Sequence, residues 1–196
     1  MMSDPVTVLD FWLGEVGPEG WYAGGEVLDR ECRMQFLELW QAAHDGGLEH
    51  WIDGAAGTLA YLVICDQLAR NMHRGSALAF ATDARALAAA KRAVEAGWDM
   101  AAPEPERQFF YMPFEHSETP EDQAQAVRLL TERMPSDPEM ALHARAHQAI
   151  IARFGRFPFR NAALGRATTP AEADFMAQGG YMAEVNRLRA SHASGA

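Results

Sequence analysis

The apolar residues of this chain recur with the period of an α-helix. Across residues 28–43 they follow one another at intervals of three or four positions, and Gly46-Gly47 ends the pattern. Similar spacing starts after the capping residue Ser76 and stops at Gly97, which predicts one continuous helix. The alternation of apolar and polar residues that signals a strand is missing from the sequence. The pattern therefore predicts an all-α fold.

Several helix starts are signalled by a polar capping residue followed by proline in the first turn. These pairs are Asp4-Pro5, Thr119-Pro120, Asp137-Pro138 and Thr169-Pro170. Residues 55–70 are apolar around most of a helical circumference, so this helix is expected at the centre of the fold. Pro113 is expected to kink or end a helix that enters the aromatic residues 109–111. The loops are short, which predicts antiparallel helix pairs arranged as a bundle or a solenoid.

The charge and composition of the chain restrict its partners. Its 196 residues carry a formal net charge of −10, which disfavours nucleic acids and anionic membrane surfaces. The longest apolar run, residues 59–65, is far shorter than the ~20 residues that span a bilayer, and the N-terminus lacks a signal-peptide pattern. Cys32 and Cys65 lie on apolar helix stripes, so we expect buried, reduced thiols in a cytoplasmic protein.

The first segment whose side chains could bind a ligand or take part in a reaction is residues 66–74. It contains Asp66, Arg70, Asn71 and Arg74. Asp66 shares the inward face of its helix, and Arg70 follows it by four residues, so the two side chains are expected to pair. Such a pair is either part of a functional site or a structural ion pair that fixes the helix end. The sequence leaves both interpretations open.

A second segment places Glu115, His116 and Glu118 just after Pro113. Two carboxylates and an imidazole in this arrangement are candidate acid–base groups or metal ligands. The alternative is a helix end at which these side chains satisfy free backbone groups.

The third segment is rich in arginine and free of acid: residues 153–166 contain Arg153, Arg156, Arg160 and Arg166, with Asn161 among them. Aromatic residues between the guanidinium groups would hold them in place for a carboxylate or a phosphate. The alternative is that these arginines pair with Asp66, Glu115 and Glu118 and cross-link helix ends.

His143 and His147 have the helical spacing that lets two imidazoles share a metal, but no third ligand is apparent. We therefore expect His147 to be a hydrogen-bonded core histidine, and we expect no metal. Glycine-rich phosphate loops are also missing from the sequence, and no cofactor is predicted.

The three segments together resemble the signatures of a bacterial family known as domain of unknown function 924. The matching motifs are Asp66-Gln67-x-x-Arg70-Asn71-x-x-Arg74-Gly75-Ser76, Pro113-Phe114-Glu115-His116-Ser117-Glu118 and Arg153-Phe154-Gly155-Arg156-Phe157-Pro158-x-Arg160-Asn161. The resemblance covers roughly residues 6–178. It implies a tetratricopeptide-like, right-handed array of stacked antiparallel helix pairs, and it implies no known activity.

The resemblance also suggests how the chain is organised. Residues 1–178 are expected to form a single helical domain, and residues 179–196 an extension with a short helix over 182–190 and a frayed tail. Members of the family usually carry a histidine where this chain has Phe159, so an activity that depends on that histidine should be lacking here.

Three hypotheses for function follow. The leading one is a binding protein whose arginine-lined polar groove takes an anionic small molecule or the acidic end of a peptide. The second is an enzyme with Glu115, His116 and Glu118 as acid–base groups, and the third is a structural protein-interaction module. The leading hypothesis predicts that the three motifs converge on one site with at least two guanidinium groups facing solvent. Its ligand-binding residues are Asp66, Arg70, Asn71, Arg74, Arg153, Arg156, Arg160 and Asn161.

Overall fold

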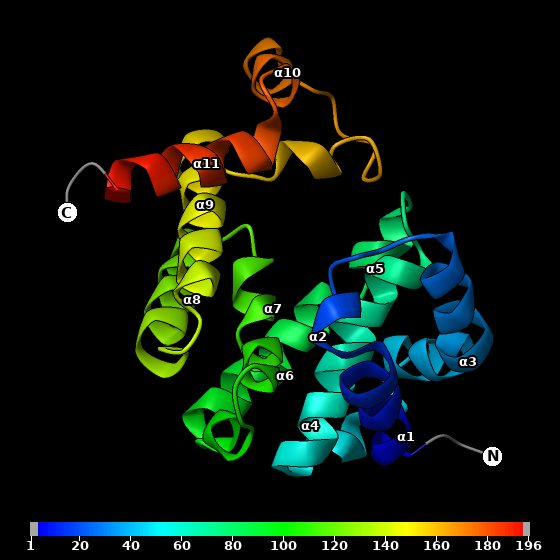
Figure 1. Cartoon of the computed structure of the whole chain (residues 1–196). Helices are drawn as coiled ribbons and strands as arrows, with labels where there is room; N and C mark the ends of the chain where they lie inside the picture. Colours follow the sequence, from blue (N-terminus) through cyan, green and yellow to red (C-terminus); the bar gives the residue numbers. More distant parts are fainter. Residues whose placement is uncertain (1–3, 194–196) are drawn as a thin grey trace. The chain divides into compact units, whose positions relative to one another are not determined.

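The computed structural model describes residues 4–193, and all regular structure among them is helical (Figure 1). The all-α prediction is confirmed, whereas the tetratricopeptide-like stacking stays a prediction. The α-helices are α1 (Pro5–Leu9), α2 (Gly17–Gly20), α3 (Glu26–His44), α4 (Ala55–Leu62), α5 (Ala69–Met72), α6 (Asp83–Glu95), α7 (Met112–Glu115), α8 (Pro120–Arg133), α9 (Pro138–Phe154), α10 (Pro170–Ala177) and α11 (Gly180–Ala193).

Shorter helical segments of other types lie between the α-helices. Two are π-helices, Asp10–Val16 and Val63–Leu68, and the second joins α4 to α5 in one continuous helix. The 3-10 helices are Glu49–Asp53, Ala77–Phe80, Trp98–Ala101, Glu106–Phe110 and Pro158–Arg160. In the part of the chain that the structure describes, no helix is both long and apolar enough to cross a membrane.

The chain divides into two compact units, Met1–Pro113 and Phe114–Ala196, called here the first and the second unit. Each has its own packed interior. The predicted domain of residues 1–178 with an extension over 179–196 stays a prediction. Within the second unit α11 packs on α9, where Val185 meets Leu142 and Ala146.

The first unit is built around the continuous helix of residues 55–72. Its side chains are buried on every face between Thr58 and Ala69, as expected for a helix that is apolar around its circumference. The stripe of α3 packs against its later part through Phe36, Trp40 and their neighbours. Cys32 and Cys65 are both buried free thiols, as predicted, and burial raises the pKa of each to about 12.

One sequence prediction fails in this unit because a buried side chain binds to another helix. The prediction of one continuous helix after Ser76 is wrong, since a 3-10 helix ends at Phe80 and α6 starts only at Asp83. The buried Thr82 between them donates a hydrogen bond of 2.5 Å to the carbonyl of Cys65. The helix that enters the aromatic residues ends at Phe110, before Pro113, in keeping with the prediction. Pro113 itself lies in the first turn of α7, where its missing N–H costs nothing.

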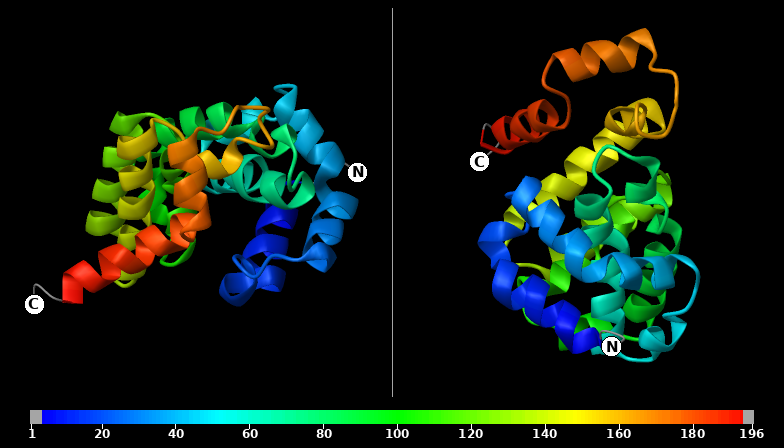
Figure 2. Two further views of the ribbon diagram at one scale, coloured as in Figure 1. Left: turned by 90° about the horizontal axis from the view of Figure 1, so that it is seen from above. Right: turned by 90° about the vertical axis from the view of Figure 1, so that its right-hand side faces the viewer.

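The second unit consists of the antiparallel pair α8 and α9, followed by a long loop, α10 and α11 (Figure 2). Asp137 caps α9 as predicted, and Thr169 forms a full capping box with Glu172 at α10. The chain turns between α10 and α11 at Gly179 and Gly180, whose φ angles of 101° and 55° favour glycine.

Candidate functional site

The first motif forms a network of ion pairs within the first unit. The predicted pair of Asp66 and Arg70 is confirmed, with 3.3 Å between a carboxylate oxygen and Nη2. Arg70 also binds Asp83 through hydrogen bonds of 3.0 and 3.1 Å and donates to the backbone carbonyl of Asp66. Asp83 lies outside the motif, at the first position of α6, and sequence spacing gave no sign of its role.

The rest of this motif is also engaged locally. Arg74 donates two hydrogen bonds, of 2.6 and 2.8 Å, to Asp29 in the first turn of α3. Asn71 is buried in α5. The motif begins inside the π-helix Val63–Leu68, where Gln67 donates a 2.5 Å hydrogen bond to Asp66. Segments of π-helix are frequent at functional sites, but here the polar groups have partners within the unit.

The second and third motifs meet in the second unit. Glu118 accepts hydrogen bonds of 2.8 Å on each carboxylate oxygen from Arg166, and the backbone N–H of Phe157 donates another of 2.9 Å. Burial by itself raises the pKa of the Glu118 carboxyl, but these hydrogen bonds outweigh it and leave the pKa below its ordinary value. Glu118 is therefore an anchor for the loop after α9, held in its ionised form.

The other side chains of the third motif fix the same loop. Arg156 donates hydrogen bonds of 2.6 and 2.9 Å to Glu172 and one of 2.8 Å to the carbonyl of Ala167. The Arg156 bonds and the backbone N–H of Thr169 hold the pKa of the Glu172 carboxyl well below its usual range. The capping glutamate of α10 thus has a second role that its sequence position did not reveal.

The remaining members of the motif differ in exposure. Arg160 is buried, with its guanidinium carbon 4.7 Å from the centre of the Phe157 ring, and Asn161 is buried beside it in sequence. Arg153 is exposed and lies over the rings of Phe154 and Phe175, at 4.7 and 5.6 Å.

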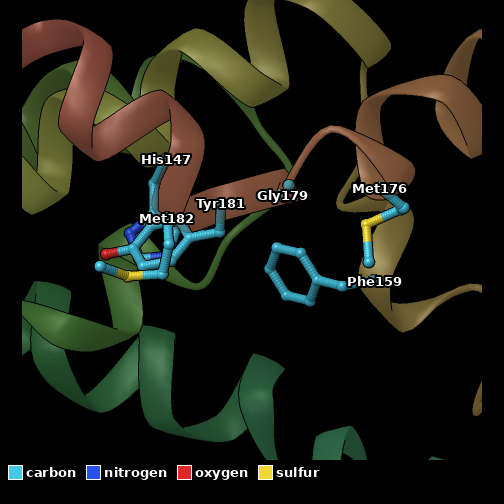
Figure 3. A pocket seen from close by; sticks show the side chains of 7 residues that line it. His147, Phe159, Met176, Gly179, Tyr181 and Met182 are labelled. Atoms are coloured by element: carbon cyan, nitrogen blue, oxygen red, sulfur yellow. The ribbon is translucent and has the colours of Figure 1, made fainter.

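A pocket of about 460 Å³ opens in the second unit and is called here the Tyr181 pocket. Figure 3 shows His147, Tyr181 and Met182 together on one side of it, and Phe159 and Met176 on the other. Its walls are mostly apolar, and Gly179 and Gly180 complete the lining. The lining residues come from α9, the 3-10 helix Pro158–Arg160, α10 and the start of α11.

His147 and Glu115 form a pair behind this pocket, and the sequence did not predict that they would meet. Nδ1 of His147 is 3.7 Å from Oε1 of Glu115, and neither atom has a hydrogen-bond partner. Glu115 is only 2% exposed, whereas the His147 side chain is 15% exposed and lines the pocket. The prediction of a hydrogen-bonded core histidine is therefore wrong for His147. Its helix face turns towards a pocket that exists only because α10 and α11 fold over it.

The neighbouring histidines have different surroundings. His143 makes a short hydrogen bond with the hydroxyl of Tyr181. Burial lowers the pKa of His143, and nearby Glu115 opposes this only in part. The ring of His116 meets that of His147 edge-on, with centroids 6.2 Å apart. Among residues 4–193 no three His, Cys, Asp or Glu side chains are grouped to hold a metal.

The structure thus brings together Glu118, Arg156 and the loop around Arg160, and it places Glu115 beside His147. A common site that also includes the first motif stays a prediction. Sequence reasoning missed Tyr181, Met176 and Met182, because their approach to His147 depends on the turn at 179–180. The Gly179-Gly180 pair was the only local sign of it.

The fold and the site define the class of this protein. It is an all-α protein with a small apolar pocket beside a loop that ion pairs fix in place. The family described as bacterial protein of unknown function (DUF924) matches residues 8–180, and the chain belongs to that family. A protein of unknown function from Agrobacterium tumefaciens has a similar solved structure, with 37% sequence identity and a TM-score of 0.82. The match covers 88% of this chain and 96% of that chain. No curated protein matches the chain.

Proposed function

We propose that this protein binds a small organic anion, or the acidic end of a peptide, in the Tyr181 pocket. One observation carries the proposal: an apolar pocket of about 460 Å³ contains one imidazole, His147, and that imidazole is backed by a buried carboxylate without a hydrogen bond. A few polar groups set in apolar walls are the usual composition of a small-molecule site.

The polar groups around the pocket favour a negatively charged ligand group. No Asp or Glu is among the residues that line it. The lining includes Gly180, Tyr181 and Met182, which form the first turn of the 14-residue helix α11. The first N–H groups of a helix have no partner within it and lie at the positive end of its dipole. The imidazole of His147 lines the same pocket and adds a polar group that can bind an anion.

The arginines enter this proposal mainly as positioning residues. Arg156 and Arg160 hold the loop that carries Phe159, one wall of the pocket, and Asn161 continues it. Arg153 has no carboxylate partner in the described part of the chain, but it lies over Phe154 and Phe175 and lines a different pocket, so it is not assigned to this ligand. Participation of the first motif in ligand binding stays a prediction.

The proposal can be tested by thermal unfolding with a panel of small carboxylates, phosphates and short acidic peptides. A ligand that binds only the folded protein at 100 times its Kd stabilises it by about 2.7 kcal/mol. Met176→Trp should fill the pocket and abolish the shift in Tm. Met34→Trp, at a highly exposed methionine of α3, is the matched control and should leave the shift intact. The proposal fails if no anion shifts the Tm, or if both variants respond like the wild type.

An acid–base enzyme is a second candidate, favoured by the approach of His147 and Glu115 to 3.7 Å. In this version His147 and His116 accompany Glu115, while Glu118 is a positioning residue because Arg166 engages it. Mass spectrometry of a stabilising ligand after incubation decides between the two. Conversion by the wild type and not by His147→Gln favours the enzyme, and an unchanged ligand in both favours binding alone.

A further inference from the structure

We infer that the anion selected by the Tyr181 pocket is an aromatic carboxylate, a flat ring that bears one carboxylate on a short arm. This inference rests on the proposed function and specifies the chemical class of its ligand. It follows from how the aromatic rings of the second unit are stacked.

The aromatic side chains that line the pocket are each supported by a second ring. Phe159, 41% exposed, stacks on the fully buried Phe157 with centroids 5.2 Å apart and an interplanar angle of 27°. On the other side Tyr181 stacks on His147, at 4.7 Å and 23°. Phe157 and His147 meet edge-on at 5.4 Å, which links the two pairs into one continuous set of four rings.

This stacking restricts how the walls can move. The guanidinium of Arg160 lies over Phe157, and the hydroxyl of Tyr181 is bound to His143, so neither stack is free to rotate. Rings already held in one orientation lose little conformational entropy when a ligand packs on them. Aromatic rings also interact favourably with one another beyond the area that they bury. A flat ligand ring gains from both effects, whereas a puckered aliphatic ring of similar size gains only from burial.

Two methionines complete the apolar lining. Met176 ends its side chain near Phe159, and Met182 lies on the side of Tyr181 (Figure 3). Thioether sulfur makes favourable contacts with the edges of aromatic rings, and an unbranched side chain adapts to the outline of the ligand. The methionines therefore suit a flat ring that enters between the two aromatic walls.

The carboxylate of the ligand would meet His147 and the first turn of α11. Glu115 also lies near this end of the site. It is 2% exposed, and its Oε1 has no hydrogen bond. His147, with Nδ1 3.7 Å from Oε1 of Glu115, would lie between Glu115 and the ligand carboxylate. Removing a buried charge from such an arrangement is costly, so Glu115 should matter for affinity although it does not line the pocket.

The inference is tested by calorimetric titration with three matched probes: 3-phenylpropionate, 3-cyclohexylpropionate and 3-phenylpropionamide. We expect the phenyl acid to bind at least five times more tightly than the cyclohexyl acid, although the cyclohexyl ring is the more hydrophobic. We expect the neutral amide to bind at least ten times more weakly than the phenyl acid. A dipeptide that ends in phenylalanine, titrated alongside, shows whether the same chemistry is better supplied by a peptide end.

Variants assign the preference to this pocket. Phe159→Leu should reduce the ratio between the phenyl and cyclohexyl acids to about one, because the flat wall is lost. Tyr22→Leu, at an exposed aromatic residue of the first unit, should leave the ratio unchanged. Glu115→Gln should weaken both acids and leave the ratio intact.

Failure of the inference and failure of the proposed function give different results. Equal or tighter binding of the cyclohexyl acid overturns the aromatic selection and leaves anion binding in place. Equal binding of the amide and the phenyl acid overturns the inference that the ligand must carry a carboxylate. If neither acid binds and no anion of the broader panel raises the Tm, the proposed function itself is wrong.

Discussion

Glu118 and Arg166, which are 48 residues apart, are joined by two hydrogen bonds of 2.8 Å. The same carboxylate accepts the backbone N–H of Phe157 at 2.9 Å. These bonds tie the segment before α8 to the loop that follows α9, and that loop carries the Phe159 wall of the pocket. The ion pair therefore links the geometry of the loop to the shape of the candidate site.

Substituting Glu118 tests the strength of this link. Glu118→Gln should lower the free energy of unfolding by about 1–3 kcal/mol, because charge-assisted hydrogen bonds to a partly buried carboxylate are lost. Glu132→Gln removes an exposed carboxylate paired with Arg128 and should cost less than about 1 kcal/mol. Urea unfolding at pH 7 measures both. Equal effects of the two substitutions would contradict the anchoring role.

The same pair has a defined dependence on pH. Since the pKa of the Glu118 carboxyl is lowered in the folded chain, its stabilising contribution is complete above the ordinary pKa of glutamate. It is lost as the pH falls from that value through the lowered folded pKa. The difference between the wild type and Glu118→Gln should therefore be constant from pH 7 to about 5 and shrink below about 4.5.

Arg70 should be the most sensitive arginine of the first unit. It is the partner of Asp66, which is almost completely buried, and of Asp83. Arg70→Met should destabilise the chain by about 3 kcal/mol, because buried carboxylates lose a positive partner. Arg128→Met, which breaks an exposed pair, should cost less than about 1 kcal/mol. Similar urea midpoints for the two variants would show that the network around Arg70 contributes little.

Two glycines should respond to alanine with opposite signs. A Cβ at Gly57 in α4 would lie 2.3 Å from the backbone oxygen of Trp51, so Gly57→Ala should destabilise by about 1–3 kcal/mol despite the helix propensity of alanine. A Cβ at Gly14, in the π-helix Asp10–Val16, would have no atom within 4 Å apart from its chain neighbours and the nearby backbone of its own helix. Gly14→Ala should stabilise by up to about 1 kcal/mol. Thermal midpoints of the two variants on the same side of the wild type would refute the contrast.

The contact between α9 and α11 should weaken in mild acid. Burial lowers the pKa of His143, which binds the Tyr181 hydroxyl, so the folded chain resists its protonation. As the pH falls below about 6.5 the undocked state takes up a proton first, and the docking free energy declines until the lowered pKa is reached. Hydrogen exchange of the α11 amides, corrected for intrinsic rates, should show full protection at pH 7.5 and less at pH 5.5. His143→Gln should remove most of that change.

The thiols of the two cysteines should be unreactive in the folded protein. Burial raises the pKa of Cys32 and Cys65 to about 12, so almost no thiolate forms at pH 8. An aromatic disulfide reagent should titrate neither thiol in the native state and both in urea. Rapid reaction of either thiol without denaturant would place it at the surface.

The features predicted correctly from sequence depend on short stretches of chain. Asp137 before Pro138 and Thr169 before Pro170 start α9 and α10, because a cap and its partner N–H groups lie within three residues of each other. The pairing of Asp66 with Arg70 follows from one turn of helix in the same way. The three motifs identified the family for the same reason, since each is a contiguous run of residues.

The partners that completed those motifs could not be predicted, because they come from elsewhere in the chain. Asp83 and Asp29 engage Arg70 and Arg74, and Glu172 engages Arg156, so acids outside the motifs balance the apparent excess of arginine. The break before α6 likewise depends on a hydrogen bond from Thr82 to a carbonyl 17 residues away. Local spacing carries no information about such contacts.

By itself the sequence determined that this protein is helical, where several of its helices begin, and to which family it belongs, because capping, helical periodicity and contiguous motifs act within a few residues. Only the tertiary structure decided which charges pair across long stretches of sequence and where the pocket lies. His147, Phe159 and Tyr181 meet because the loop after α9 is fixed by ion pairs and the chain turns at Gly179 and Gly180. The contact between these three residues depends on the path of the chain from α9 to α11. Residues far apart in sequence fix that path together.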